Sequence, residues 1–120
     1  MPLDPARLAA ALLHDCHTRL AVYGSLQPGE QHHDLVEDLP VVARGALAGR
    51  VTDLDGYPVL RLDPAADRVD VVVLAGAALS DRWEELDRFE GPAYRRDLVI
   101  VEVDERGGVL VASCYVASGA

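Results

Sequence analysis

The central part of the chain has the apolar, β-branched character of strands, and turn residues interrupt it at regular distances. Residues 41–54 are rich in Val, Ala and Gly, and Asp55-Gly56 then predicts a tight hairpin turn. Residues 57–62 form the returning strand. After a turn that starts at Asp63-Pro64, residues 68–74 form another strand. We therefore expect a β-hairpin followed by a third strand.

Further strands are predicted on both sides of this region. Residues 18–22 form a short strand that runs into the loop Tyr23-Gly24-Ser25-Leu26. Near the other end, residues 98–103 and 109–116 form a hairpin around a turn at 106–108. Because hairpins join most of these strands and helical segments lie between them, the predicted fold class is α+β.

A helix with one apolar face is predicted between the two groups of strands. Leu79, Trp83, Leu86 and Phe89 recur at spacings of four, three and three, which places them on one side of a helix. Ser80 is the expected N-cap of this helix. Gly91-Pro92 is the expected end, with Gly just past the last turn and Pro behind it. Trp83 and Phe89 are therefore interpreted as core residues.

The beginning of the chain also has helical character. Asp4 followed by Pro5 is a plausible helix start, and residues 6–15 are rich in Ala and Leu. A short helical turn is expected within residues 30–37. The apolar run at 8–13 is too short to cross a bilayer and is a poor signal peptide. We expect a cytoplasmic, single-domain protein over residues 1–120, with residues 1–17 as a helical extension.

Charge removes several classes of function. The 120 residues include 11 Arg, no Lys, no Asn and 20 acidic residues, so the net charge is −9. A phosphate-binding Walker loop and Schiff-base chemistry both need a Lys. Nucleic-acid binding depends on a basic surface, which an acidic protein lacks. Cys16 and Cys114 lie far apart and suggest no disulfide framework. We expect no nucleic-acid or membrane partner, and a monomer or weak homodimer.

The loop Tyr23-Gly24-Ser25-Leu26 is the first candidate site. A loop that bends at a Gly can expose successive backbone N–H groups to an anion, either a carboxylate or a developing oxyanion. The alternative is an ordinary turn between a strand and a loop. Ser25 is a weak candidate nucleophile because the sequence around it lacks the G-x-S-x-G pattern.

Glu90 is the second candidate. It lies at the predicted C-terminal end of a helix, where the helix dipole disfavours a negative charge by about 0.3–1 kcal/mol. The dipole and any burial would raise its pKa toward the range useful for proton transfer. The alternative is a solvated Glu that pairs with Arg88, Arg95 or Arg96.

The other titratable residues give weaker signals. His14, Cys16 and His17 have no second ligand cluster at a typical zinc spacing, and the adjacent pair His32-His33 does not converge on one metal, so no metal site is expected. Tyr57, Tyr94 and Tyr115 lie at predicted strand ends or edges, where they belong either to the core or to a pocket wall.

Three motifs resemble the γ-glutamylcyclotransferase-like superfamily, which includes the AIG2-like proteins. They are LAVYGSLQPGEQHHDL at residues 20–35, GRVTDLDGYPVL at 49–60 and LDRFEGPAYRRDLV at 86–99. The resemblance covers about residues 19–116 and is strongest to the γ-glutamylamine cyclotransferase branch. His32 stands where the family usually has Asn.

The resemblance implies a compact mixed β-barrel with packed helices and a pocket at its mouth. It also implies release of 5-oxoproline and a free amine from a small γ-glutamyl substrate, without a cofactor. Glu90 matches the family's catalytic glutamate. Tyr23, Gly24, Ser25 and Leu26 match the substrate-binding loop, and Tyr94 and Tyr115 match positions that line the pocket.

Three functions are consistent with these features. The first is a cyclotransferase in which the substrate's own α-amine attacks its γ-carbonyl while Glu90 acts as acid and base. The second is a protein of the same fold that binds a small metabolite without converting it. The third is a purely structural or interaction role, which a solvent-exposed Glu90 and the lack of a cavity beside Tyr23 would favour.

Overall fold

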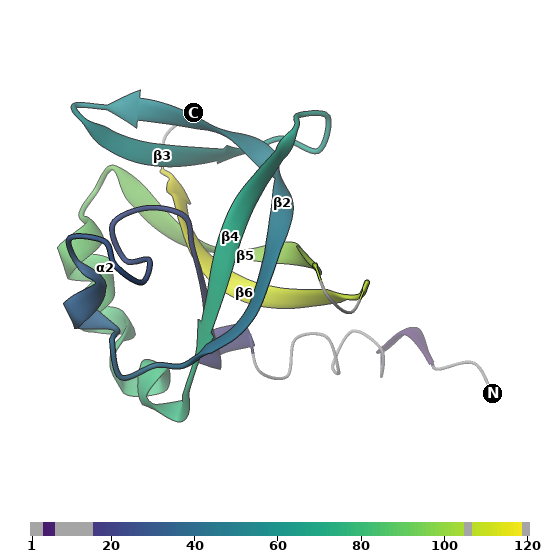
Figure 1. Ribbon diagram of the computed structural model, residues 1–120, viewed down its shortest axis with the longest axis horizontal. Helices are drawn as coiled ribbons and strands as arrows, with labels where there is room; N and C mark the ends of the chain where they lie inside the picture. Colours follow the sequence, from purple (N-terminus) through teal and green to yellow (C-terminus); the bar gives the residue numbers. More distant parts are fainter. Residues whose placement is uncertain (1–3, 7–15, 105–106, 119–120) are drawn as a thin grey trace.

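The computed structural model describes residues 4–6, 16–104 and 107–118. It contains β-strands, short 3₁₀ helices and a two-turn α-helix (Figure 1). The strands are β1 (Arg19–Val22), β2 (Val41–Leu54), β3 (Tyr57–Leu62), β4 (Arg68–Ala75), β5 (Tyr94–Val103) and β6 (Val109–Ala117). The helices are η1 (Cys16–Thr18), η2 (His33–Leu35), η3 (Ala77–Asp81) and α2 (Trp83–Glu90).

Five of the strands close into a mixed barrel. The strands pair in the order β3-β2-β4-β1-β6-β5, and β5 pairs again with β2, which completes the circle. The β1–β6 pair is parallel and the other pairs are antiparallel. At the closure Gly45 lies opposite Val103, and a Cβ on Gly45 would collide with the carbonyl oxygen of Glu102. The barrel predicted from the family resemblance is therefore confirmed.

The predicted hairpin at Asp55-Gly56 is also confirmed. β2 and β3 pair from Gly49 opposite Leu62 to Leu54 opposite Tyr57, with the two turn residues between them. Asp55 has φ 54° and Gly56 has φ 90°, so both lie in the left-handed region that a two-residue hairpin turn requires. β3 pairs only with β2, so this hairpin projects beyond the closed barrel (Figure 1).

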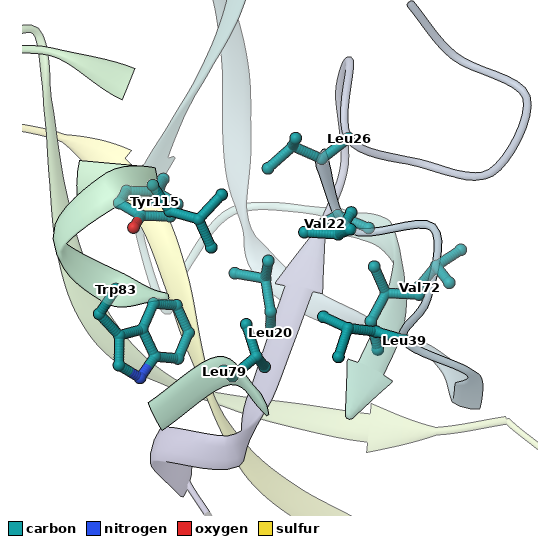
Figure 2. Close-up of a cluster of buried hydrophobic side chains, with 11 residues drawn as sticks. Leu20, Val22, Leu26, Leu39, Val72, Leu79, Trp83 and Tyr115 are labelled. Atoms are coloured by element: carbon teal, nitrogen blue, oxygen red, sulfur yellow. The ribbon is translucent and has the colours of Figure 1, made fainter. Parts of the chain in front are cut away.

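The alternation of side chains along the strands produces two separate cores. In β1, Leu20 and Val22 point to one core while Ala21 points to the other. The barrel core takes buried residues from all six strands. The helix-side core packs α2 and the loop after β1 against the outside of the barrel, with Trp83 and Leu79 near Leu20 and Tyr115 (Figure 2). β1 is consequently buried on both faces.

Three sequence predictions about α2 and the strand that follows it are wrong. Ser80 does not cap α2, because it lies inside η3 and Arg82 occupies the N-cap position. Phe89 is not a core residue: 41% of its surface is exposed, whereas Trp83 and Leu86 are buried. Strand β5 begins at Tyr94 rather than at residue 98, because the polar residues that start it pair with the end of β6.

Other predictions are confirmed or lie outside the described residues. α2 ends at Glu90, and Gly91 follows with φ 79°, as expected for a residue just past a helix. The helical turn expected within residues 30–37 is the 3₁₀ helix η2. Most of the predicted N-terminal helix falls on residues outside the described part of the chain.

Among the described helices, none has both the length and the apolar character needed to span a membrane.

Candidate active site

A pocket of about 440 Å³ opens where the end of α2 meets the tip of the β2–β3 hairpin. The loop after β1, the residue that precedes η2 and the strand β6 complete its walls. The seven site residues predicted from the sequence all line this pocket: Tyr23, Gly24, Ser25, Leu26, Glu90, Tyr94 and Tyr115. Tyr23 and Tyr115, 92 positions apart in the sequence, are therefore brought to one cavity.

The loop at residues 23–26 reaches the pocket because β1 ends at Val22. The Gln27 N–H donates to the Gly24 carbonyl at 3.0 Å, and the His32 N–H donates to the Ser25 carbonyl at 2.8 Å. Among the described residues, no acceptor is recorded for the backbone N–H groups of Gly24, Ser25 and Leu26. The loop thus directs the carbonyls of Gly24 and Ser25 into its own turns, while its three successive N–H groups have no recorded acceptor among the described residues.

Gly24 is favoured by its close neighbour rather than by its backbone angles. A Cβ at this position would lie 3.0 Å from the Cγ of Pro58 on β3. The missing side chain lets the loop and the hairpin approach each other closely.

Glu90 is the last residue of α2 and is half-buried in the pocket. Burial raises the pKa of its carboxyl from the ordinary 4.5 to about 7. Among the described residues no ion pair involves Glu90, since Arg88 pairs with Glu84, Arg95 with Asp97 and Arg96 with Asp87. The alternative of a surface Glu neutralised by one of these arginines is therefore wrong.

The three tyrosines around Glu90 use their hydroxyl groups to hold the pocket together. The Tyr23 hydroxyl donates to the Tyr115 carbonyl at 2.7 Å and accepts from the Leu60 N–H at 3.0 Å. The Tyr94 hydroxyl donates to the Pro58 carbonyl at 2.8 Å. Tyr23 and Tyr94 thus fix β3 at two alternate residues, so their rings form the pocket wall while their hydroxyls are already engaged.

Tyr115 fixes the helix instead. Its hydroxyl donates to Asp87 Oδ1 at 2.6 Å, and the other carboxylate oxygen of Asp87 pairs with Arg96 at 3.5 Å. Arg96 in turn lies over the Trp83 ring, 4.5 Å from its centroid. Burial, followed by the Asp87 hydrogen bond, raises the pKa of Tyr115 well above its usual value, so its hydroxyl keeps its proton. This network holds the last turn of α2, and with it Glu90, against β6.

Sequence reasoning missed part of the pocket. His32, Phe89 and the hairpin residues Leu54, Asp55 and Pro58 also line it. The His32 ring meets the Phe89 ring edge-on at 5.0 Å, and its Nδ1 is buried without a hydrogen-bond partner among the described residues. The Asp55-Gly56 turn was visible in the sequence, but nothing in the sequence placed that turn beside Glu90.

No metal centre accompanies these groups in the part of the chain that the structure describes. Within residues 4–6, 16–104 and 107–118, no three His, Cys, Asp or Glu side chains lie close enough together to hold a metal ion.

A family comparison places this arrangement among known proteins. Residues 20–120 match the model of the family described as gamma-glutamyl cyclotransferase, AIG2-like. The chain belongs to this family. All pocket segments described above fall within the matched residues.

The sequence of a characterised relative agrees with this assignment. A gamma-L-glutamyl-butirosin B gamma-glutamyl cyclotransferase from Niallia circulans is 31% identical over 102 residues, which is 81% of this chain and 65% of that protein. This chain therefore spans about two thirds of the length of that relative.

Solved structures share the fold. An AIG2-like protein from Mus musculus superposes with a TM-score of 0.70 at 23% identity, over 86% of this chain and 79% of that chain. A protein from Arabidopsis thaliana superposes with a TM-score of 0.68 at 24% identity, over 85% of this chain and 70% of that chain. At these identities the likeness concerns the barrel and its helix.

Proposed function

We propose that the protein is a cofactor-independent γ-glutamyl cyclotransferase that releases 5-oxoproline and a free amine from a γ-glutamyl amine or γ-glutamyl peptide. The observation that carries the proposal is Glu90, a half-buried carboxylate of raised pKa with no ion-pair partner among the described residues. Family membership supports the reaction type.

The nucleophile in this reaction is the substrate's own α-amine. At neutral pH this amine is mostly protonated, so the Glu90 carboxylate first accepts one of its protons. The nitrogen lone pair then attacks the γ-carbonyl carbon, closing the five-membered ring, and the bond from that carbon to the leaving amine breaks. Glu90 returns this proton to the leaving nitrogen and then transfers the second proton of the ring nitrogen in the same way, so the lactam keeps one N–H and the amine leaves as an ammonium ion. A carboxyl with a pKa of about 7 exchanges protons in both directions near neutral pH.

Because the ring closes within one substrate molecule, the protein does not have to supply a nucleophile. Intramolecular attack carries a high effective concentration, so positioning replaces a protein nucleophile. The N–H groups of residues 24–26 are available to hold the substrate α-carboxylate or the oxyanion that forms on the γ-carbonyl. The tyrosine rings enclose the site, which limits water and strengthens these interactions.

The two other functions make different predictions. A structural role would fit an exposed Glu90 without a cavity, but Glu90 is half-buried and lines a pocket of about 440 Å³. A protein that only binds a small metabolite would use the same pocket, so the distinction between binding and catalysis falls to an activity measurement.

The test is release of 5-oxoproline from a panel of γ-glutamyl amines and γ-glutamyl peptides by the purified chain. We expect turnover of at least one, and a loss of about 100-fold or more in kcat for Glu90→Gln, because general acid–base catalysis contributes roughly that factor. Glu85→Gln, an exposed change on the same helix, is the matched control and should keep full activity. Binding of 5-oxoproline without any turnover would favour the metabolite-binding function, and full activity of Glu90→Gln would exclude the proposed mechanism.

A further inference from the structure

The pocket changes character between its floor and its rim. Floor residues are buried: Ala21, Val22 and Tyr115 expose 2%, 3% and 5% of their surfaces. The rim carries large apolar side chains that are exposed to solvent, namely Tyr57 at 56%, Leu54 at 46% and Phe89 at 41%. Exposed apolar side chains that converge on a cavity mouth are typical of a binding surface. The rim therefore offers an exposed apolar surface that is separate from Glu90 and from the loop at residues 23–26.

The rim also carries a negative charge. Asp55 occupies the turn between Leu54 and Tyr57, where φ values of 54° at Asp55 and 90° at Gly56 define a tight turn. Next to the turn, the hairpin is held by the hydrogen bond from the Tyr94 hydroxyl to the Pro58 carbonyl. The backbone of Asp55 thus has a defined place at the mouth of the pocket, which the residue lines.

No permanent cation balances this charge in the described lining of the pocket. The lining residues include Asp55 and Glu90 but no Arg, and the chain has no Lys. The whole molecule has a net charge of −9. The mouth of the pocket is therefore a region of negative potential bordered by apolar surface, which attracts cations and repels anions.

The position of the reacting groups determines how the substrate is oriented in the pocket. The γ-glutamyl part must lie near Glu90 and the N–H groups of residues 24–26, which places the scissile bond inside the pocket. The leaving amine then extends from that bond toward the rim formed by Leu54, Asp55, Tyr57 and Phe89.

We infer that this rim is a subsite for a leaving amine that carries a second positive charge at the end of a short apolar chain, with Asp55 as the residue that determines this specificity. The inference rests on the proposed function for the direction in which the substrate lies. The methylene groups pack on Phe89, Leu54 and Tyr57, and the terminal ammonium pairs with Asp55. A leaving group that ends in a carboxylate meets the same charge and is disfavoured.

Three γ-glutamyl amides with linkers of similar length test the inference. Their amine parts are 1,5-diaminopentane, with a terminal cation, pentylamine, with no charge, and 6-aminohexanoate, with a terminal anion. We expect kcat/KM to fall in that order. The pair with Asp55 is solvent-exposed, so we expect about a threefold advantage of the diamine over pentylamine in low salt, and a smaller one in 0.5 M salt.

Asp55→Asn removes the charge and keeps the turn, because Asn-Gly is itself a favoured hairpin dipeptide. We expect the diamine-to-pentylamine ratio to fall to about one. Asp53→Asn is the matched control: Asp53 is exposed in the same hairpin, pairs with Pro58 in the strand ladder and is not among the lining residues. It removes the same charge and should leave the ratio unchanged.

Equal kcat/KM for the diamine and pentylamine amides in the wild-type chain would overturn the inference, as would equal changes in the ratio by Asp55→Asn and Asp53→Asn. If none of the three amides is turned over, the proposed function fails for these substrates. Calorimetric Kd values for the same amides then decide the subsite separately. Tightest binding of the diamine, lost in Asp55→Asn, supports it, and equal or undetectable binding contradicts it.

Discussion

The last turn of α2 presents two carboxylates, Asp87 and Glu90, to two different environments. On one side Asp87 accepts the Tyr115 hydroxyl at 2.6 Å and pairs with Arg96. On the other side Glu90 lines the pocket, and none of the described residues forms an ion pair with it. Burial without a counter-charge raises the pKa of Glu90 to about 7. One carboxylate is therefore paired at the helix end, and the other is buried without a counter-charge and is the proton carrier of the proposed mechanism.

The difference shows that the same residue chemistry supports structure or function according to its partners. A carboxylate that is hydrogen-bonded and paired contributes to stability, whereas one that is buried without a partner costs stability whenever it is charged. In the proposed mechanism the raised pKa of Glu90 is what makes this carboxylate useful for proton transfer. Three measurements distinguish the role of Glu90 from the role of Asp87 and its partner Tyr115.

The largest expected effect is on the pH dependence of turnover. Only the deprotonated form of Glu90 can accept a proton from the substrate, so kcat/KM should rise about tenfold per pH unit up to a midpoint near 7 and then level off. The measurement is kcat/KM of the wild-type chain between pH 5 and 8. Asp87→Asn should keep this midpoint, and a profile that is flat from pH 5 to 8 would contradict the assignment of Glu90 as the base.

The next effect is on stability, and its sign differs between the two carboxylates. Because the Glu90 pKa is about 7 in the folded chain and ordinarily 4.5, the folded state binds more protons between these values, so stability falls as pH rises. Glu90→Gln should match the wild-type chain near pH 4 and exceed it above pH 7. With allowance for solvent screening of a half-buried group, we expect a gain of about 1–2 kcal/mol.

Thermal unfolding at pH 4 and pH 8 measures this crossover. Asp87→Asn serves as the opposite case, since it weakens the pairing with Arg96 and should lower Tm at pH 8. A lower Tm for Glu90→Gln than for wild type at pH 8 would show that Glu90 is a stabilising residue.

The smallest effect concerns the Tyr115 hydroxyl. Tyr115→Phe removes its hydrogen bond to Asp87, and because Asp87 is partly exposed we expect a loss of about 1 kcal/mol in the free energy of unfolding. Urea denaturation of the variant checks this value. Tyr57→Phe is the control for stability, because Tyr57 is exposed and no hydrogen bond of its hydroxyl is recorded among the described residues. Equal effects of the two changes would show that the Tyr115–Asp87 bond contributes nothing.

Local patterns predicted the elements whose signals are local. The Asp55-Gly56 turn, the three strands around it and the end of α2 before Gly91 all appear where the sequence places them. Glu90 was recognisable because an acid at the C-terminal end of a helix works against the helix dipole. These features depend on backbone geometry within a few residues, which turn chemistry and periodicity report directly.

Features that depend on distant partners were predicted poorly. Phe89 has the spacing of a core residue, but the helix-side core ends before it, so its ring lies at the pocket rim against His32. The start of β5 at Tyr94 depends on pairing with Ala117, which the polar residues at that point of the sequence do not reveal. A periodic pattern tells which side chains share a face, but not what covers each part of it.

By itself, the amino-acid sequence determined the α+β class, the hairpin, the helix end and the two segments that matter most, Glu90 and the loop at residues 23–26. Only the tertiary structure decided that the tip of the β2–β3 hairpin lies beside them, that the tyrosine hydroxyls are already engaged, and that no described arginine reaches Glu90. The reason is physical: turn and helix preferences are set by neighbours in the chain, whereas burial and charge compensation are set by neighbours in space.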